Sequence, residues 1–177
     1  MKSEYHGIYA ALVTPYTSEG KVDYRELQKL VDYLICQGLE GFYVNGSTAE
    51  AFLLSEEERN SSTEHAISFA KNAEKCGADA VSAISPFYYK FSEAEIVQYY
   101  QDIMSSTELP MFVYNFPNFS GFSLTAEVLE KLNHNKNLLG VKFTSSDMFL
   151  LEQIKTLHPE LVVWNGFDEM LSAGLVM

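Results

Sequence analysis

Short apolar runs alternate with amphipathic segments along the whole chain of 177 residues, and this alternation limits the fold more than any other feature. Continuous apolar runs of this length are typical of strands that are buried on both faces of a parallel sheet. The amphipathic segments between them predict helices. The expected strands are Ile8–Val13, Gly41–Val44, Ala80–Ile84, Met111–Tyr114, Leu138–Lys142 and Leu161–Trp164.

The predicted helices have recognisable starts and ends. Asp23 precedes the first helix, Glu26 follows three residues later, and Gly38 ends it, and these residue types are preferred at helix caps. Alternation of strands and helices favours βαβ units around a parallel sheet, either open or closed into a barrel. Two later pairs have the spacing of a capping box: Ser55 with Glu58, and Ser92 with Glu95.

The predicted strands are unevenly spaced. Between the second and third runs lie two helical pieces, one starting near Ser55 and one near Thr63, with no strand between them. Six strands are predicted, whereas a (β/α)8 barrel has eight strands and usually about 250 residues. Because no linker or low-complexity stretch divides the chain, we expect one α/β domain over residues 1–177.

The composition limits the kinds of partner. The net charge of −12 leaves no basic stripe for nucleic acid, and the apolar stretches are too short to span a bilayer. The first residues lack the apolar region of a secretory signal. Cys36 and Cys76 form no CxxC pair and lie in helical patterns, which predicts packing residues in a reducing compartment. We therefore expect a cytoplasmic protein that binds neither nucleic acid nor membranes.

Lys142 is the first candidate for chemistry, because it ends an apolar run where a charge is unusual. Loss of hydration disfavours the ammonium form and makes the amine more nucleophilic toward a carbonyl group. A lysine at a strand end that extends its ammonium to the solvent is the alternative, and from this residue alone it is the commoner case.

Tyr114 ends another predicted strand in the equivalent position. The ends of different strands converge at the mouth of a parallel barrel, so the phenol of Tyr114 could reach a group attached to Lys142. A phenol in that position can relay a proton. A tyrosine that packs in the core with a satisfied hydroxyl is the alternative.

Two turns that follow predicted strands carry further polar residues. In the run Gly-Ser-Thr-Ala-Glu at 46–50, Ser47 and Thr48 follow a glycine turn that could hold a carboxylate. In the run Trp-Asn-Gly-Phe-Asp-Glu at 164–169, Asp168 and Glu169 are suited to sugar hydroxyls, or they are ordinary acids of a first helical turn. No metal site is predicted, because the four histidines share no ligand spacing: His6, His65, His134 and His158.

Several of these motifs together resemble the Schiff-base aldolases of the N-acetylneuraminate lyase and dihydrodipicolinate synthase group. The resemblance runs from about Gly7 to the last residue and rests on GSTAE, SAISPFYY, VYNFP, GVKFTSSD and NGFDE. It implies a (β/α)8 TIM barrel, usually a homotetramer, that needs no cofactor. It also implies that Lys142 forms an imine, that Tyr114 relays a proton, and that Ser47 and Thr48 bind the carboxylate of a pyruvate unit.

Two details resemble the sialic-acid branch of the group. The synthase branch has an arginine two residues after the proline of VYNFP, and here that position is Phe119. The NGFDE run is similar to a segment that contacts the sugar, which implies contacts from Asp168 and Glu169. Thr144 and Gly166 match further positions that line the substrate in that branch. The implied reaction is cleavage of N-acetylneuraminate to N-acetylmannosamine and pyruvate.

The sequence departs from the family pattern in two places. Around Arg59–Thr63 most of a helix and the third strand are missing, and the eighth strand is absent. We therefore expect an incomplete barrel of about six strands. Two other functions stay open: an inactive chain that associates with intact subunits, and an aldolase for another 2-keto-3-deoxy acid.

Overall fold

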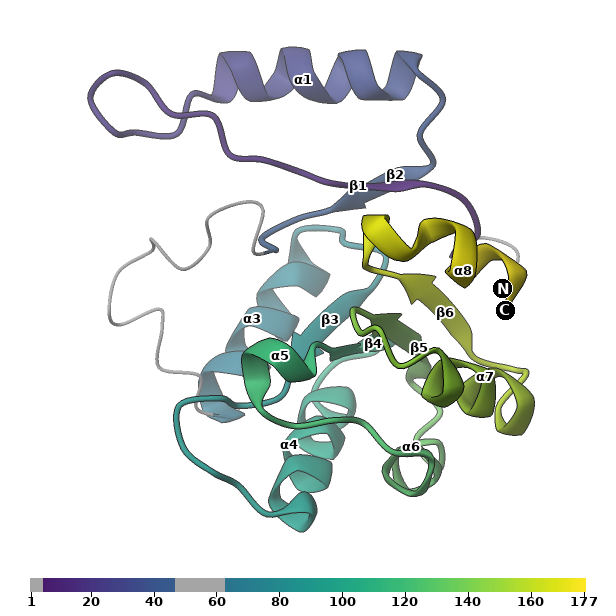
Figure 1. Ribbon diagram of the computed structural model, residues 1–177. Helices are drawn as coiled ribbons and strands as arrows, with labels where there is room; N and C mark the ends of the chain where they lie inside the picture. Colours follow the sequence, from purple (N-terminus) through teal and green to yellow (C-terminus); the bar gives the residue numbers. More distant parts are fainter. Residues whose placement is uncertain (1–4, 47–62) are drawn as a thin grey trace. The chain divides into compact units, whose positions relative to one another are not determined.

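The computed structural model describes residues 5–46 and 63–177 (Figure 1). Contacts within the chain divide it into two compact units, residues 1–60 and residues 61–177. Each unit contains a parallel sheet, of two strands in the first and four in the second. The predicted pair Ser55 and Glu58 lies outside the described residues.

The first unit contains β1 (Tyr9–Ala11), α1 (Tyr24–Cys36) and β2 (Gly41–Tyr43). The two strands pair in parallel, with Tyr9 opposite Gly41. As predicted, Asp23 caps α1, and its carboxylate accepts hydrogen bonds from the backbone N–H groups of Arg25 and Glu26. Gly38 follows the helix with a φ of +85°, a backbone conformation that glycine adopts without strain.

The second unit is a four-stranded parallel sheet in the order β3-β4-β5-β6. The strands of both units lie within two residues of the predicted bounds, so all six predicted strands are confirmed. The strands of this sheet are β3 (Val81–Ile84), β4 (Met111–Asn115), β5 (Leu138–Phe143) and β6 (Val162–Asn165). The helices are α3 (Thr63–Lys75), α4 (Glu93–Ser105), α5 (Pro117–Ser120), α6 (Ala126–Leu132), α7 (Met148–Leu157) and α8 (Leu171–Val176).

The two faces of the four-stranded sheet differ in what covers them. Met111, Val113, Val141 and Phe143 face the core that α3, α4, α6 and α7 contribute to, and all four are fully buried. Because side chains alternate across a strand, the residues between them face the other way. That second face carries aromatic and polar side chains as well as aliphatic ones, and it holds the candidate site.

Helix α4 begins with the capping box that the sequence predicts. The Ser92 hydroxyl accepts a hydrogen bond from the Glu95 backbone, and the Glu95 carboxylate accepts one from the Ser92 backbone. The prediction for the cysteines is wrong in one respect. Cys36 and Cys76 are both free thiols, but both are exposed and do not pack in a core. Cys36 is the last residue of α1, which has no buried residue, and Cys76 directly follows the last residue of α3.

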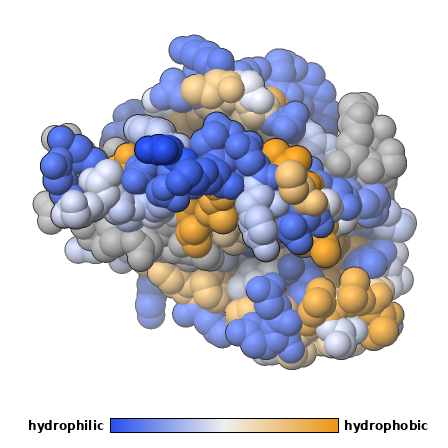
Figure 2. Space-filling view, turned by 90° about the horizontal axis from the view of Figure 1, so that it is seen from above, coloured by the Kyte–Doolittle hydropathy of each residue, from blue (hydrophilic) through white to orange (hydrophobic). Residues whose placement is uncertain are grey.

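The face in Figure 2 is mainly hydrophilic, with several separate hydrophobic patches between the polar side chains. None of the helices in the described part of the chain is both long and apolar enough to cross a membrane.

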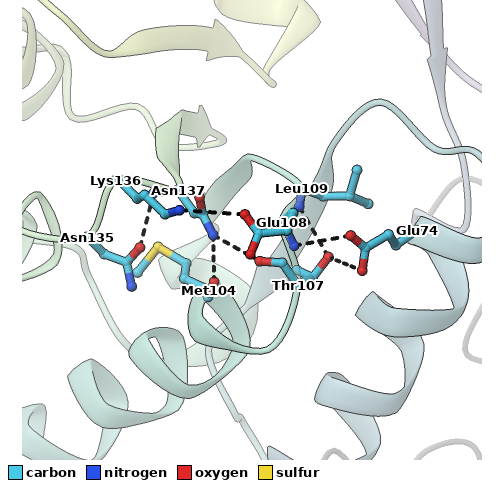
Figure 3. A network of polar contacts seen from close by, with 8 residues as sticks. All are labelled: Glu74, Met104, Thr107, Glu108, Leu109, Asn135, Lys136 and Asn137. Atoms are coloured by element: carbon cyan, nitrogen blue, oxygen red, sulfur yellow. Dashed lines mark hydrogen bonds and ion pairs between the residues drawn. The ribbon is translucent and has the colours of Figure 1, made fainter.

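A polar network joins helices to the sheet at the N-terminal ends of β4 and β5 (Figure 3). The Asn137 amide donates hydrogen bonds to the carbonyl oxygens of Met104 and Thr107, at 2.8 and 2.9 Å. The Thr107 hydroxyl and the Glu108 backbone N–H both donate to the Glu74 carboxylate on α3. The network therefore fixes the end of α4 against both α3 and the start of β5.

We expect Asn137→Ala to lower the free energy of unfolding by about 1–3 kcal/mol, because two carbonyl groups near the end of α4 lose their donor. Lys136→Ala is the matched control. Its ammonium forms an exposed ion pair with Glu108 at 3.5 Å, and such a pair contributes about 0–1 kcal/mol. Urea unfolding followed by circular dichroism measures both variants, and equal midpoints for the two would contradict this interpretation.

Candidate functional site

Lys142 and Tyr114 lie side by side near the C-terminal ends of two neighbouring strands. They are directly opposite each other in the register of β5 and β4, so both side chains leave the same face of the sheet. The Lys142 Nζ atom lies 4.5 Å from the centroid of the Tyr114 ring. Each residue is the last but one of its strand, and the two side chains lie close together, as expected from the sequence.

The surroundings of Lys142 lower the pKa of its amine to about 8, against an ordinary value of 10.5. Burial is the main cause, because it removes hydration from the ammonium form. The negative charge of Asp168 acts in the opposite direction and raises the pKa. Burial therefore outweighs the nearby carboxylate, as a nucleophilic amine requires.

A pair of aromatic residues lies on the same face of the sheet, with Trp164 opposite Lys142 and Phe112 one inward-facing position earlier. The rings of Phe112 and Trp164 stack with their centroids 3.9 Å apart and their planes 19° from parallel. They belong to β4 and β6, the strands on either side of β5. Gly140 lies between them on β5 and has no side chain to separate the two rings.

The segment after β6 brings the predicted Gly166 against Thr144, which follows β5. A Cβ atom at Gly166 would come within 2.0 Å of the Thr144 hydroxyl, so only glycine fits there. Thr144 is 4% exposed, and its hydroxyl oxygen has no hydrogen-bond partner among the described residues. A buried hydroxyl without a partner is costly in a folded protein, which makes it a natural contact for a ligand.

Asp168 and Glu169 begin a 3-10 helix, Asp168–Met170, directly after this segment. Both are exposed. Their position in a first turn also satisfies the simpler interpretation, since carboxylates favour the positive end of a helix. Only Asp168 has a described link to the lysine, through its electrostatic effect on the pKa of Lys142.

A chain of aromatic rings crosses the C-terminal rim of the sheet. Phe116 stacks on Tyr114 at 5.8 Å and on Phe119 at 5.9 Å, and it meets Phe167 edge to face at 6.3 Å. Phe119 in turn contacts Phe87, from the segment after β3, at 4.7 Å. Phe119, at the position where the synthase branch has an arginine, therefore belongs to an apolar cluster next to the phenol.

The structure brings Lys142, Tyr114, Thr144 and Gly166 to one end of the sheet, with Asp168 close enough to influence the lysine. Ser47 and Thr48 lie outside the described residues. Within residues 5–46 and 63–177, no group of three or more histidine, cysteine, aspartate or glutamate residues could hold a metal ion.

Sequence reasoning missed the stacked pair of Phe112 and Trp164. A signal for it is present in the sequence, because a glycine stands two residues before the lysine on the same strand face. That signal becomes informative only when the strand register is known, since the register places Phe112 opposite the glycine on β4 and places Trp164 two positions beyond its partner on β6.

These features define a class of protein: an α/β chain with a desolvated lysine and a tyrosine at the C-terminal ends of parallel strands, the position where such folds bind ligands. Comparison with known proteins then gives the family. The model of the dihydrodipicolinate synthetase family matches residues 4–61 and 60–177. The chain belongs to this family.

Among curated relatives, the N-acetylneuraminate lyase of Rhizobium meliloti is 40% identical over 194 residues, which cover 97% of this chain and 64% of the relative. The N-acetylneuraminate lyase of Citrobacter koseri is 39% identical and is covered over 67% of its length. The chain thus spans about two thirds of the length of the Citrobacter koseri relative and slightly less than two thirds of the Rhizobium meliloti relative.

Solved structures give the same result for the fold. CdNal of Clostridium difficile, crystallised in complex with mannosamine, is 32% identical with a TM-score of 0.89 over 97% of this chain and 67% of that one. A catalytic lysine mutant of the sialic acid aldolase of Ruminococcus gnavus is 27% identical with a TM-score of 0.92, and 65% of its chain is covered. The fold is therefore that of an incomplete (β/α)8 barrel, as the sequence predicts.

Proposed function

We propose that this protein is a Schiff-base lyase that cleaves N-acetylneuraminate to N-acetylmannosamine and pyruvate, with Lys142 as the imine-forming residue. The observation that carries the proposal is the amine of Lys142, which has a pKa of about 8 and lies 4.5 Å from the Tyr114 ring. At pH 7 a pKa of about 8 leaves roughly 10% of the amine free, against roughly 0.03% for an ordinary lysine. The relatives named N-acetylneuraminate lyase support the choice of substrate.

The proposed reaction begins when the free amine of Lys142 attacks the C2 ketone of open-chain N-acetylneuraminate. Loss of one water molecule gives a protonated imine, which withdraws electrons from the C3–C4 bond. As that bond breaks, the proton of the C4 hydroxyl passes to the phenol of Tyr114, which relays its own proton to the substrate carboxylate. N-acetylmannosamine leaves as an aldehyde.

The remaining enamine takes up a proton at C3 and becomes the imine of pyruvate. Water hydrolyses this imine, which releases pyruvate and returns the amine of Lys142. In this scheme Ser47 and Thr48 bind the carboxylate of the pyruvate unit, and Thr144 and Gly166 line the substrate. Asp168 and Glu169 accept hydrogen bonds from hydroxyl groups of the sugar.

Trapping with pyruvate and borohydride tests the proposal directly. We expect pyruvate to add a stable mass to the peptide that contains Lys142, because borohydride reduces the imine to a secondary amine. The initial rate of trapping should rise with pH and level off above about pH 8, since only the free amine attacks. Peptide mass spectrometry measures the adduct.

The exposed Lys155 on α7 is the internal control and should stay unmodified under the same conditions. No adduct on Lys142, under conditions that label a full-length relative, would contradict the proposal. That outcome would favour the alternative in which the chain only associates with intact subunits, and size-exclusion chromatography of a mixture with such a relative then tests the association.

An aldolase for another 2-keto-3-deoxy acid is the second candidate function. The exposed positions of Asp168 and Glu169 favour it, because no described contact fixes either side chain for one particular sugar. Comparison of the cleavage rates of N-acetylneuraminate and of simpler 2-keto-3-deoxy acids separates the two functions, and equal rates favour this alternative.

We also propose that the protein is a cytoplasmic homo-oligomer, with the tetramer expected from the family resemblance. The free thiols of Cys36 and Cys76 support the compartment, since a reducing environment preserves exposed thiols. Analytical ultracentrifugation measures the assembly.

A further inference from the structure

The strand register places an unusual arrangement directly beside and beneath Lys142. Trp164 on β6 lies opposite Lys142, while Tyr114 lies opposite it on β4. One inward-facing position earlier, Phe112, Gly140 and Val162 form the next row across the same three strands. The lysine side chain therefore has aromatic residues on both neighbouring strands and a residue without a side chain before it on its own strand.

Gly140 lies in the same row as Phe112, at a point where β5 and β6 approach each other closely. A Cβ atom there would come within 1.9 Å of the Val162 carbonyl oxygen, so the close approach of β5 and β6 leaves room only for glycine. The gap above Gly140 is filled from both sides by Phe112 and Trp164, whose rings stack at 3.9 Å. Phe112 is 1% exposed and Trp164 is partly buried, so the stack is closed to water on the Phe112 side.

Burial lowers the pKa of the Lys142 amine, whereas two neighbours of the lysine favour its ammonium form. The Tyr114 ring, 4.5 Å from Nζ, stabilises the ammonium form, and the Asp168 carboxylate favours the same form. Both act to keep the lysine charged. The pKa of Lys142 nevertheless falls to about 8 because burial dominates, and the stacked pair lies next to the lysine on the same sheet face.

We propose that the stacked pair of Phe112 and Trp164 is an apolar floor that closes the space beneath Lys142 to water and keeps its amine in the form that attacks a keto acid. This inference deepens the proposed function and rests on the role of Lys142 stated there. Phe112 and Trp164 are positioning residues, because they act on the substrate only through the lysine.

Trace acetylation of lysines over a range of pH tests the floor without any keto acid. Acetic anhydride acetylates a lysine only in its free amine form, so the pH midpoint of labelling at Lys142 reports how readily that amine loses its proton. Peptide mass spectrometry follows Lys142 relative to the exposed Lys155 in the same chain. We expect Trp164→Leu to raise the midpoint by about one pH unit, and so to lower labelling at pH 7 by about tenfold, because water enters the space of the lost ring.

Three further variants make the result specific. Phe112→Leu removes the other ring and should shift the midpoint in the same direction. Trp164→Phe keeps a ring in the stack and should stay close to the wild-type value. Phe143→Leu is the matched control, because Phe143 is a fully buried aromatic residue next to Lys142 in sequence but lies on the helix-covered face. It should lower stability and leave the midpoint unchanged.

A folded Trp164→Leu variant with the wild-type midpoint would overturn the inference, as would a Phe143→Leu shift as large as that of Trp164→Leu. If Trp164→Leu shows no cooperative melting, the midpoint of Phe112→Leu decides in the same way. Pyruvate trapping separates this inference from the proposed function. A trapped wild type with unshifted variants contradicts the floor alone, whereas an untrapped wild type contradicts the function of Lys142 and with it the catalytic role of the floor.

Discussion

Lys142→Met is expected to abolish both the pyruvate adduct and the cleavage of N-acetylneuraminate, with a loss of at least about 10³-fold in kcat/KM. Methionine has nearly the same length as lysine and fills the same space beside the Tyr114 ring, but it has no amine to attack the ketone. No other lysine is described next to a strand-end tyrosine in the four-stranded sheet. A coupled assay of released pyruvate measures the loss.

Lys155→Met is the matched control for this variant. It removes one positive charge from the exposed side of α7 and should leave the rate of cleavage unchanged. Cleavage by Lys142→Met at a tenth of the wild-type rate or more would show that the reaction does not pass through an imine at this residue.

The same variant has an expected effect on stability that depends on pH. The pKa of Lys142 falls from 10.5 in the unfolded chain to about 8 in the folded one, so folding disfavours the ammonium form. The resulting penalty is complete below about pH 8 and disappears as the pH rises through 10.5. We therefore expect Lys142→Met to be more stable than the wild type at pH 7, by about 1 kcal/mol once partial access of water is allowed for, and to lose this advantage near pH 10.5.

Tyr114→Phe is expected to slow the cleavage of N-acetylneuraminate by about 10²–10⁴-fold. The phenylalanine ring keeps the stacking on Phe116 and the contact with the Lys142 ammonium, but it cannot relay the proton of the C4 hydroxyl. The adduct with pyruvate and borohydride should still form on Lys142, because attack of the amine does not need the C4 proton. Measuring trapping and turnover on the same preparation separates the two steps.

Phe116→Leu is the control for Tyr114→Phe, because it disturbs the ring that packs on Tyr114 and leaves the phenol in place. We expect it to change turnover far less than the loss of the hydroxyl does. Equal losses in the two variants would mean that Tyr114 acts through packing and not through its proton.

Local signals were strong enough to place the elements of the fold. The apolar runs at 111–114 and 138–142 became β4 and β5 with shifts of one residue, and Asp23 and Ser92 cap α1 and α4 as expected. These features depend on residues that are close in sequence, which is why they can be read without the structure. The cysteines show the limit of such reasoning. A helical pattern predicts the element but not what covers each side of it, and Cys36 and Cys76 are exposed.

Some residues of the candidate site could likewise be selected from the sequence, and others only from the structure. Lys142 and Tyr114 could be selected from the sequence because each ends an apolar run, and the structure then brings them within 4.5 Å. Asp168 could be selected too, but its effect on the pKa of the lysine depends on a distance through space. The stacked rings of Phe112 and Trp164 could not be located without the strand register, since they are 52 positions apart and meet only across an intervening strand.

The sequence by itself determined the order of strands and helices, the caps, the family and the two side chains proposed for the chemistry, because each depends on local pattern or on motifs. Only the tertiary structure decided the register of β4, β5 and β6, and with it which residues surround the amine. That register turns an ordinary strand-end lysine into one with a pKa of about 8, since loss of hydration arises from neighbours that the chain brings together only when it folds.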